Sequence, residues 1–486
     1  MSSSLVVVGT TTNRIDEIDT RPRCRANSFH RTRASRWTPR SFWLIGILDP
    51  SFDPSSVCSV TNTDDVLLEL DIGDIAGGGG CVGRAPDGRV VFVRHALPGE
   101  RVMARVTATT TSFLRADAVE ILRTSPDRVT PPCPHAGPGH CGGCDFQHVS
   151  LEGQRRLKAF RAAEQLHHFT GLEREIDVAP VEGDTDGLGW RTRVRLGVDP
   201  GGRVGFRRHR SHELELVESC PIACPEAMET GAFRAAWPGV QEIEIAVAPD
   251  RNQAIVAVVT PPKSMPALPP LRTGMVVNGR VRKQPGDVHT DVAAHTFRVS
   301  AGVFWQVHVG AADALARAVR HEMGAVRGDR VVDLYAGAGL FSVVLADQVG
   351  SEGSVLAVER DRRACADAER NGRNYPQMSV KKASITPKFI ETGLSQPDLL
   401  VLDPAREGAG QAVMAALSTH GATVRRLVYV SCDPASFGRD ARVLLDGAWT
   451  LTSIRAFDIF PMTEHVELVA RFDPPEAEPA HHREVS

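Results

Sequence analysis

Two kinds of hydrophobic pattern divide the 486-residue chain. From Val66 to about Arg123, short apolar runs alternate with polar positions and are separated by turns rich in Gly and Pro. Runs of this kind predict a small five-stranded β-barrel of OB-like type. From about residue 310 onwards, near-continuous apolar runs alternate with helical patterns, and the runs lie at 330–335, 354–359, 398–403 and 426–431. This second alternation predicts an α/β fold with a doubly wound, Rossmann-like parallel sheet.

These changes of pattern predict five parts along the chain. The N-terminal residues are rich in Arg, Ser and Thr without sustained periodicity, which favours a disordered or misassigned extension over a basic arm that touches RNA. The segment between the two apolar patterns reads as a mixed α+β domain with one long helix, Leu151 to Leu172. The expected parts are an extension (1–60), a barrel (61–125), a central domain (126–300), an α/β domain (301–475) and a tail (476–486).

A basic hairpin is expected in the central domain, with strands at 190–198 and 203–207. Because alternate strand positions share a face, Arg191, Arg193 and Arg195 would line one surface. Four further arginines follow in the same region, at Arg203, Arg207, Arg208 and Arg210. A charged strand face is often only solvated, but this density of arginine favours contact with phosphate.

Composition limits the classes of protein that fit. The formal net charge is −3, so a surface that binds nucleic acid must be local. Every apolar run is far shorter than the roughly 20 residues that span a bilayer, so we expect no membrane domain. The N-terminal residues lack a basic region of the secretory type, and we therefore expect a cytoplasmic protein. In a reducing compartment, its ten cysteines would be ligands or thiols rather than disulfides.

Three of the cysteines are clustered, in the pattern Cys133-x7-Cys141-x2-Cys144. Far downstream, Cys220 and Cys224 are two candidates for a fourth position. Three clustered thiols and a distant fourth could hold zinc or an iron–sulfur cluster, and free thiols are the third possibility.

Acidic residues flank a glycine turn at the ends of two expected strands. Asp333 precedes Gly337 and Gly339, and Glu359 ends the next apolar run, twenty residues after Gly339. A carboxylate at the end of the second strand can accept hydrogen bonds from both hydroxyls of an adenosine ribose. Asp333 would repel a pyrophosphate, whereas it would attract the cationic sulfonium of S-adenosylmethionine. The sequence therefore predicts a site for S-adenosylmethionine.

A further acid and a cysteine end the next two apolar runs. Asp403 precedes Pro404, and Cys432 precedes Asp433 and Pro434. Because the carboxyl ends of parallel strands meet at one edge, both side chains would face the cofactor. A helix that begins at Pro434 would stabilise a Cys432 thiolate. The competing interpretations are a helix cap for Asp403 and a core thiol for Cys432.

A thiolate beside a methyl donor suits the methylation of uracil C5, which is a poor nucleophile. Addition of the thiolate to C6 activates C5, C5 takes the methyl group, and a base then removes the C5 proton so that the thiolate leaves. On chemistry alone, four residues near the C-terminus could be this base: Asp458, Glu464, His465 and Glu467.

The order of these motifs resembles the RNA (uracil-5-)-methyltransferase family. The matching motifs are Phe304-Trp305-Gln306-Val307, Asp333-Leu-Tyr-Ala-Gly-Ala-Gly339, Asp403-Pro-Ala-Arg406, Val430-Ser-Cys432-Asp-Pro434 and Asp458-x-Phe460-Pro461-x-Thr463-x-His465-x-Glu467. The likeness runs from about residue 60 to 472. It implies a class I methyltransferase domain, a barrel of the TRAM type that binds RNA, and methylation of uridine C5 in RNA through a covalent adduct.

The resemblance also implies roles for single residues. Cys432 would be the nucleophile and Glu467 the base. The contacts to S-adenosylmethionine would come from Gln306, Tyr335, Glu359 and Asp403. Similar family members that act on ribosomal RNA hold a 4Fe-4S cluster, here on Cys133, Cys141, Cys144 and Cys220. We therefore expect ribosomal RNA rather than transfer RNA as the partner, and a monomer without membrane association.

Two departures from the family pattern keep other functions open. Leu340 and Ala383-Ser384 stand where family members often have polar contacts to the cofactor. They fit a non-catalytic RNA-binding protein on the same fold, which the intact Cys432 and Glu467 oppose. An RNA cytidine-C5 methyltransferase is the other alternative, but that class typically has a second cysteine at the Asp-Pro motif, which the segment from Asp403 lacks.

Overall fold

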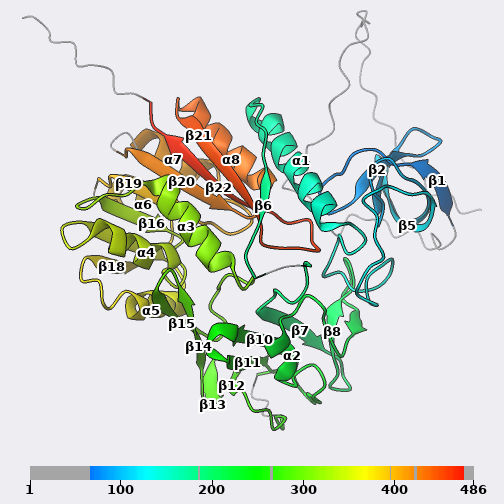
Figure 1. Ribbon diagram of the computed structural model, residues 1–486, viewed down its shortest axis with the longest axis horizontal. Coiled ribbons are helices and arrows are strands. Elements are labelled where there is room, and N and C mark those ends of the chain that lie inside the picture. Colours follow the sequence, from blue (N-terminus) through cyan, green and yellow to red (C-terminus); the bar gives the residue numbers. More distant parts are fainter. Residues whose placement is uncertain (1–65, 184–185, 263–265, 395, 421–423, 476–486) are drawn as a thin grey trace, which may run out of the picture. The chain divides into compact units, whose positions relative to one another are not determined.

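The computed structural model describes residues 66–183, 186–262, 266–394, 396–420 and 424–475 (Figure 1). The expected N-terminal extension and C-terminal tail lie outside these ranges. The described residues form sheets of five, seven, two and eight strands. Within them, no helix has the length and apolar character needed to cross a membrane.

The first sheet confirms the five strands expected near the N-terminus. It contains β1 (Leu67–Asp71), β2 (Cys81–Arg84), β3 (Val90–Arg94), β4 (Arg101–Thr109) and β5 (Phe113–Arg123), in the order β1-β4-β5-β3-β2. Buried and exposed positions alternate along the strands, as expected for a sheet with one face toward a core. Gly73 N donates to Val82 O at 2.7 Å and Val82 N to Asp74 O at 2.9 Å, so the segment after β1 joins β2.

The central segment begins with helix α1 (Leu151–Thr170), which confirms the expected helix. The Ser150 hydroxyl caps its first turn by accepting from Gly153 N, and Gly171 ends it at φ 74°. A seven-stranded sheet follows, in the order β13-β12-β11-β10-β7-β8-β9. Its elements are β7 (Arg193–Val198), β8 (Val204–Arg207), β9 (Leu214–Leu216), β10 (Glu242–Ala248), β11 (Gln253–Val259), β12 (Gly274–Val277) and β13 (Arg280–Lys283), with α2 (Pro225–Glu229) after β9.

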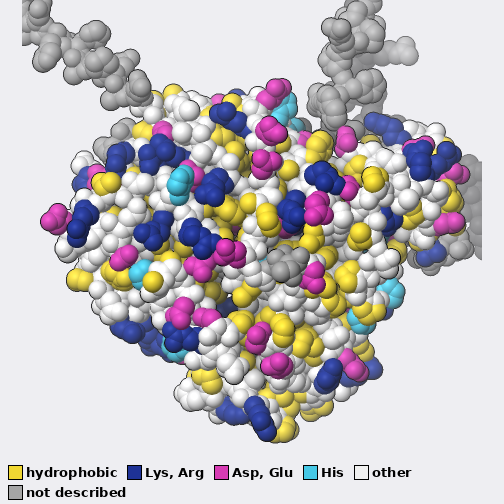
Figure 2. All heavy atoms as spheres, in the orientation of Figure 1, with side chains coloured by type: hydrophobic (Ala, Val, Ile, Leu, Met, Phe, Trp, Pro, Cys, Tyr) yellow, Lys and Arg dark blue, Asp and Glu magenta, His cyan; other side chains and the backbone are white. Residues whose placement is uncertain are grey.

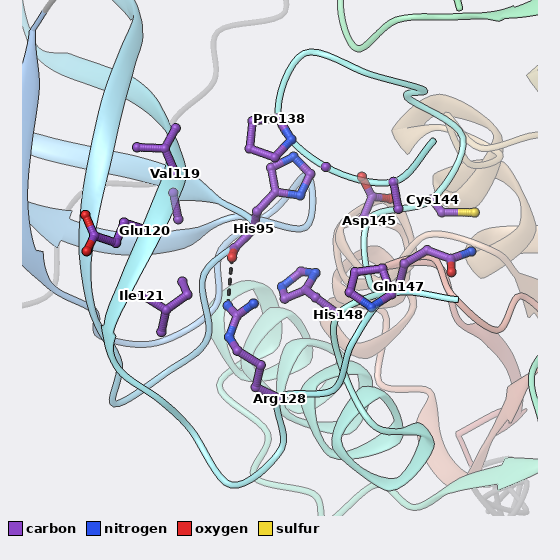
Figure 3. Close-up of a pocket in the computed structure, with 14 residues that line it drawn as sticks. His95, Val119, Glu120, Ile121, Arg128, Pro138, Cys144, Asp145, Gln147 and His148 are labelled. Atoms are coloured by element: carbon purple, nitrogen blue, oxygen red, sulfur yellow. Dashed lines mark hydrogen bonds between the residues drawn. The ribbon is translucent and has the colours of Figure 1, made fainter. Parts of the chain in front are cut away.

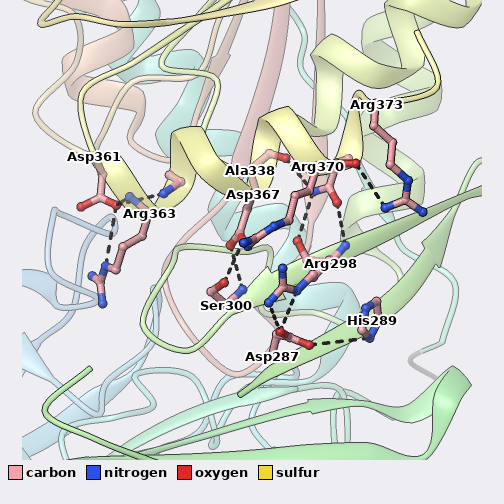
Figure 4. A network of polar contacts seen from close by, with 12 residues as sticks. Asp287, His289, Arg298, Ser300, Ala338, Asp361, Arg363, Asp367, Arg370 and Arg373 are labelled. Atoms are coloured by element: carbon pink, nitrogen blue, oxygen red, sulfur yellow. Dashed lines mark hydrogen bonds and ion pairs between the residues drawn. The ribbon is translucent and has the colours of Figure 1, made fainter. Parts of the chain in front are cut away.

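A two-stranded hairpin, β14 (Asp287–Val292) and β15 (His295–Ser300), leads to the last domain. It is tied to α5 (Arg362–Asn371) by polar contacts (Figure 4). The backbone N–H and the hydroxyl of Ser300 donate to the buried Asp367 carboxylate at 2.8 and 2.7 Å. Arg298 N donates to Asn371 Oδ1 at 2.9 Å, which fixes the hairpin to the same helix.

The last domain is built on an eight-stranded sheet in the order β18-β17-β16-β19-β20-β22-β21-β6. Its strands are β6 (Val178–Pro180), β16 (Arg330–Leu334), β17 (Ser354–Glu359), β18 (Met378–Lys382), β19 (Leu399–Leu402), β20 (Arg426–Ser431), β21 (Thr450–Asp458) and β22 (Glu467–Asp473). The five strands from β18 to β20 are parallel, whereas β22 is antiparallel to both of its neighbours. The four apolar runs expected to be strands are therefore confirmed.

Helices cover both faces of this sheet, which confirms the doubly wound fold. On β20, Val428 and Val430 face a core built with α3 (Ala311–Met323) and α4 (Leu340–Val349). The alternate residues, Leu427 and Tyr429, face a second core. That core includes residues of α1, α6 (Pro387–Gly393), α7 (Gln411–His420) and α8 (Pro434–Asp446).

Two elements that precede residue 300 belong to this layered structure. Strand β6 pairs in parallel with β21, with Val178 opposite Ala456. Helix α1 lies against α8, where a Cβ atom on Gly438 would approach Phe169 to 2.8 Å. The part expected as the central domain thus contributes one helix and one strand to the α/β domain, whose boundary at 300 stays a prediction.

Candidate active site

The antiparallel strand β22 brings Cys432 and Glu467 together. Its register with β20 pairs Ser431 with Leu468, so the next position sets Cys432 directly opposite Glu467. Side chains directly opposite on antiparallel strands have Cβ atoms about 4.5–5.5 Å apart. The Glu467 carboxyl also raises the pKa of the Cys432 thiol, as expected for close neighbours. The sheet topology therefore places the expected nucleophile and base face to face.

Two further carboxyl groups lie at this edge of the sheet: Asp403, which is half-buried and acts on both members of the pair, and the buried Asp333 beside it. Burial raises the pKa of Asp333 and of Asp403 to about 7, and the Asp333 charge adds to the effect on Asp403. Burial and Asp403 raise the pKa of Glu467 well above its ordinary value. A bound cation would stabilise the ionised forms of all three. The electrostatics of the site therefore favour a positively charged ligand.

The turn after β16 presents the residues expected to contact the cofactor. Tyr335 and Glu359 follow paired positions on β16 and β17, and Tyr335 adopts a left-handed φ of 64°. Glu359 Oε2 accepts from Gly337 N at 3.0 Å, which fixes the carboxylate beside the glycine turn. Asp403 follows the adjacent strand β19. Gln306 is buried on the segment before α3, and the cofactor roles of all four stay predictions.

A hydroxyl replaces the third glycine of a dinucleotide motif. Ser342 lies in α4, is fully buried, and donates to Asp333 Oδ2 at 2.5 Å. The sequence did not predict this contact, for which the local signal is an acid nine residues before a helical serine. Leu340 is buried in the core between α3, α4 and the sheet, so its side chain contributes packing.

The surroundings of Cys432 favour the neutral thiol in the absence of a bound cation. Burial raises its pKa to about 12, and Glu467 and Asp403 add to this effect, while Arg406 lowers it. The Asp433 carboxylate already caps α8 by accepting from Ser436 N at 2.7 Å. Stabilisation of the thiolate by the helix N-terminus stays a prediction, and burial and nearby carboxyl groups oppose it.

The other three candidates for the base are engaged elsewhere. Asp458 forms a buried ion pair with Lys158 at 2.5 Å. The Arg406 guanidinium contacts the His465 ring at 2.7 Å, and burial followed by the Arg406 charge lowers the pKa of His465 to about 3. The Glu464 carboxylate accepts from backbone N–H groups of the glycine turn after β1. Within the described ranges, the Glu467 carboxylate forms no ion pair or hydrogen bond, which leaves it available.

Helix α1 anchors the segment that carries Glu467, and sequence reasoning missed this. Lys158 Nζ also donates to Phe460 O at 3.0 Å, and Gln154 Oε1 accepts from Met462 N at 2.7 Å. Both α1 side chains are buried. No local signal identifies them, because their partners lie about three hundred positions away in the chain.

The four cysteines expected as metal ligands are all free thiols. Burial raises the pKa of Cys141 to about 11, and Cys220 and Cys133 add to the effect, so these thiols are neighbours. Burial raises the pKa of Cys144 to about 12, and Cys220 and Cys141 add to this effect in the same way. Across the described ranges, however, no three His, Cys, Asp or Glu side chains are arranged to hold a metal ion.

Other residues near the cysteines have separate partners. His135 and His140 contact Glu215 at 3.0 and 3.2 Å. Cys224 caps α2 and is buried in the core of the central sheet, which favours Cys220 as the fourth member. A cavity of about 260 Å³ lies between the five-stranded sheet and the cysteine loop; Figure 3 shows Cys144 on its wall.

The expected row of phosphate-binding arginines is not free. Arg193 is buried, donates to Val303 O at 2.6 Å and pairs with Glu244 at 3.3 Å. Arg195 pairs with the same Glu244 at 3.0 Å. The prediction was wrong for Arg193, which is buried and therefore does not line a surface. For the exposed Arg195 it stays a prediction, although β10 supplies a carboxylate that sequence alternation does not reveal.

Comparisons with known proteins agree with this arrangement. A family model described as TRAM domain matches residues 67–119. An uncharacterized RNA methyltransferase of Streptomyces coelicolor is 44% identical over 427 residues, which cover 84% of this chain and 92% of that protein. The 23S rRNA (uracil(1939)-C(5))-methyltransferase of Psychrobacter arcticus is 32% identical over 441 residues, covering 79% and 84%. Pyrococcus abyssi tRNA (uracil-54, C5)-methyltransferase, in complex with S-adenosyl-L-homocysteine, shares the fold with a TM-score of 0.65 and 21% identity, covering 83% and 100%.

Proposed function

The chain belongs to the RNA (uracil-5-)-methyltransferase family, and from this premise we propose that it methylates C5 of a uridine in ribosomal RNA through a covalent adduct with Cys432. The activity is S-adenosylmethionine-dependent methylation of uracil C5 in RNA. The observation that carries the residue assignment is the position of Cys432 directly opposite Glu467. The ribosomal substrate is supported by the relative that acts on 23S rRNA. The monomeric state and the cytoplasmic location stay predictions.

S-adenosylmethionine, when bound, supplies an electrophilic methyl group and a positive charge. That charge would favour the thiolate of Cys432. Burial and the nearby carboxyl groups otherwise favour the neutral thiol. The thiolate would add to C6 of the uracil, and the electron pair that develops at C5 would bond to the methyl carbon as its bond to the sulfonium sulfur breaks, leaving S-adenosylhomocysteine. The target uracil leaves its base stack to reach the half-buried Cys432 thiol.

Glu467 then completes the turnover. Its carboxylate takes the C5 proton, the C5–C6 double bond re-forms, and the bond between C6 and the Cys432 sulfur breaks to return the thiolate. The raised pKa of Glu467 suits this task, because a base works best when its pKa lies nearer the working pH. The neighbouring Asp458 is neutralised by Lys158 and is not needed as a second base.

Labelled methyl transfer to ribosomal RNA, followed by digestion to nucleosides, tests this function. We expect 5-methyluridine from the unmodified protein and none from Cys432→Ala. Cys81→Ala is the matched control, because Cys81 is buried in the core of the five-stranded sheet and its loss leaves the site intact. Labelled 5-methylcytidine, or no labelled nucleoside with S-adenosylmethionine still bound, would contradict the proposal, as would full activity of Cys432→Ala.

We also propose that Cys133, Cys141, Cys144 and Cys220 hold a 4Fe-4S cluster. The support is chemical: the four side chains are free thiols, and their mutual effects on pKa require proximity. Such a cluster would cross-link the loop at 133–144 to the segment before α2. We assign it no step of methyl transfer.

Iron and acid-labile sulfide content, measured on anaerobically purified protein with its visible absorption, tests the cluster. We expect Cys220→Ser to lose the cluster and Cys224→Ser to keep it, because Cys224 belongs to the core of the central sheet. Stoichiometric zinc, or the absence of bound metal, would overturn the assignment.

A further inference from the structure

Positive side chains gather where the five-stranded sheet meets the turn between β8 and β9. Arg94 ends β3 and Arg115 lies on β5, and these strands are parallel neighbours in which Phe92 pairs with Arg115. Both arginines occupy half-buried positions that alternate with buried core residues, so they share the outward face of the sheet. His209 and Arg210 of the β8–β9 turn complete this group, which we call the cation cluster.

The loop at 141–145 brings the two parts of the cation cluster together, because a Cβ atom on Gly142 would approach His209 N to 2.8 Å and Asp145 of the same loop pairs with Arg94. Burial lowers the pKa of His209 to about 4, and the charges of Arg94, Arg210 and Arg115 add to this effect. The pKa of Arg115 is likewise lowered by burial and then by Arg210, and that of Arg210 by burial and then by Arg94. His209 therefore senses a net positive field.

Carboxyl groups compensate this charge only in part. Asp145 pairs with Arg94 at 3.5 Å, and Asp117 lies opposite Arg94 in the strand register. Glu464 also favours the charged form of Arg210. In the part of the chain that the structure describes, Arg115 and Arg210 form no ion pair. A half-buried guanidinium group, that of Arg115, and an exposed one, that of Arg210, lie beside other cations, and a bound anion would stabilise this arrangement.

An aromatic surface adjoins the cation cluster. The rings of Phe92 and Phe113 meet edge to face with centroids 5.5 Å apart. The Arg115 guanidinium lies 5.2 Å from the centroid of Phe113. Arginines beside aromatic rings on the face of an OB-like sheet are the elements with which such folds hold single-stranded nucleic acid.

The backbone at the β8–β9 turn supports a functional role for Arg210. Its φ of 52° lies in the left-handed region, which is unfavourable for a residue with a Cβ atom. A glycine there would remove this cost but also the charge. Residues held in such conformations tend to occur at binding sites.

We propose that Arg115 and Arg210, supported by Arg94, bind a backbone phosphate of single-stranded RNA, so that two separate parts of the chain jointly form one phosphate site. The inference rests on the proposed function only in taking RNA as the ligand. It retains Arg210 from the arginines that the sequence predicted to contact phosphate, and it adds Arg94 and Arg115 of the five-stranded sheet, which the sequence did not single out. Arg193 and Arg195 of β7 pair with Glu244 instead.

Fluorescence anisotropy with a labelled single-stranded RNA that contains uridine tests the site, without S-adenosylmethionine and over a series of salt concentrations. Each phosphate contact on a single strand contributes about 0.7 to the slope of log affinity against log salt, or about fivefold in affinity at 0.1 M salt. We expect Arg115→Gln and Arg210→Gln each to show these losses, and Arg115→Lys to keep the slope. Arg203→Gln is the matched control, because this exposed arginine pairs with Asp199.

The outcomes separate this site from the proposed reaction. Unchanged affinity and slope in both glutamine variants would overturn the phosphate site, even if the protein methylates uridine. Arginine-dependent binding by a protein that methylates no RNA would leave the site standing and contradict the proposed function. If each variant unfolds at the same temperature as the unmodified protein, the lower affinity reflects RNA binding and not folding.

Discussion

At the scale of single residues, the site is defined by where its protons reside. Cys432 is a half-buried thiol whose pKa is raised to about 12 by burial and then by Glu467 and Asp403, while the Arg406 charge lowers it. The sequence motifs identify the cysteine and the acids that surround it. They do not reveal the protonation state, because burial depends on the folded sheet and because Asp433 already caps the helix.

Arg406→Gln should lower the reactivity of Cys432. The Arg406 charge lowers the pKa of the thiol, so its removal raises that pKa and reduces the thiolate fraction at any pH below it. Alkylation by iodoacetamide, followed at the Cys432 peptide by mass spectrometry, should therefore be slower and shift to higher pH. Arg442→Gln on α8 is the control, since Arg442 pairs with Asp446 on the surface. Equal or faster alkylation in Arg406→Gln would contradict this electrostatic account.

At the scale of elements, apolar runs predict the strands and their doubly wound arrangement well. The pattern gives no sign that β22 inserts antiparallel between β20 and β21, because a buried strand reads alike in either direction. That insertion is what sets Glu467 opposite Cys432. The sequence also did not predict that α1 anchors the active-site segment, because the ion pair of Lys158 is with Asp458, far along the chain.

Lys158→Met should destabilise the α/β domain strongly. It leaves Asp458 buried without its partner, and the loss of one member of a buried ion pair costs about 3–5 kcal/mol of unfolding free energy. Adding Asp458→Asn should recover much of the loss, because no buried charge then remains unpaired. Arg156→Met, which removes an exposed ion pair from the same helix, should cost no more than about 1 kcal/mol. Urea denaturation measures the unfolding free energy of these three variants. A loss of stability in Lys158→Met no larger than that in Arg156→Met would contradict the role of Lys158 as an anchor.

At the scale of the whole molecule, the surface carries mixed charge, and the five-stranded sheet contacts the active-site segment through one short turn. Figure 2 shows Lys and Arg interspersed with Asp and Glu over the visible face, as expected for a net charge of −3. The glycine turn of the five-stranded sheet meets the active-site segment, where Gly78 and Gly79 donate to Glu464. The run of glycines was predicted only as a turn, because its partner on the α/β domain is not visible in the local sequence.

Gly79→Ala should weaken methyl transfer more than Gly88→Ala. Both glycines have a positive φ, 70° and 87°, so the backbone strain of the two substitutions is similar. At Gly79 the new Cβ would also approach the Asp145 Cβ to 2.7 Å, whereas at Gly88 it would meet nothing within 4 Å. We expect the two variants to unfold at similar temperatures, whereas Gly79→Ala should have a higher KM for RNA. Identical kinetics in the two variants would show that this docking contact does not matter.

The covalent link between Cys432 and the RNA is the most direct test of the mechanism. In Glu467→Gln the C5 proton cannot be removed, so methylated RNA should stay attached to the protein on a denaturing gel. Mass spectrometry should place the methylated nucleotide on the Cys432 peptide, and the Cys432→Ala, Glu467→Gln double variant should form no adduct. Release of methylated RNA by Glu467→Gln at the unmodified rate, without an adduct, would contradict the pairing of Cys432 as nucleophile with Glu467 as base.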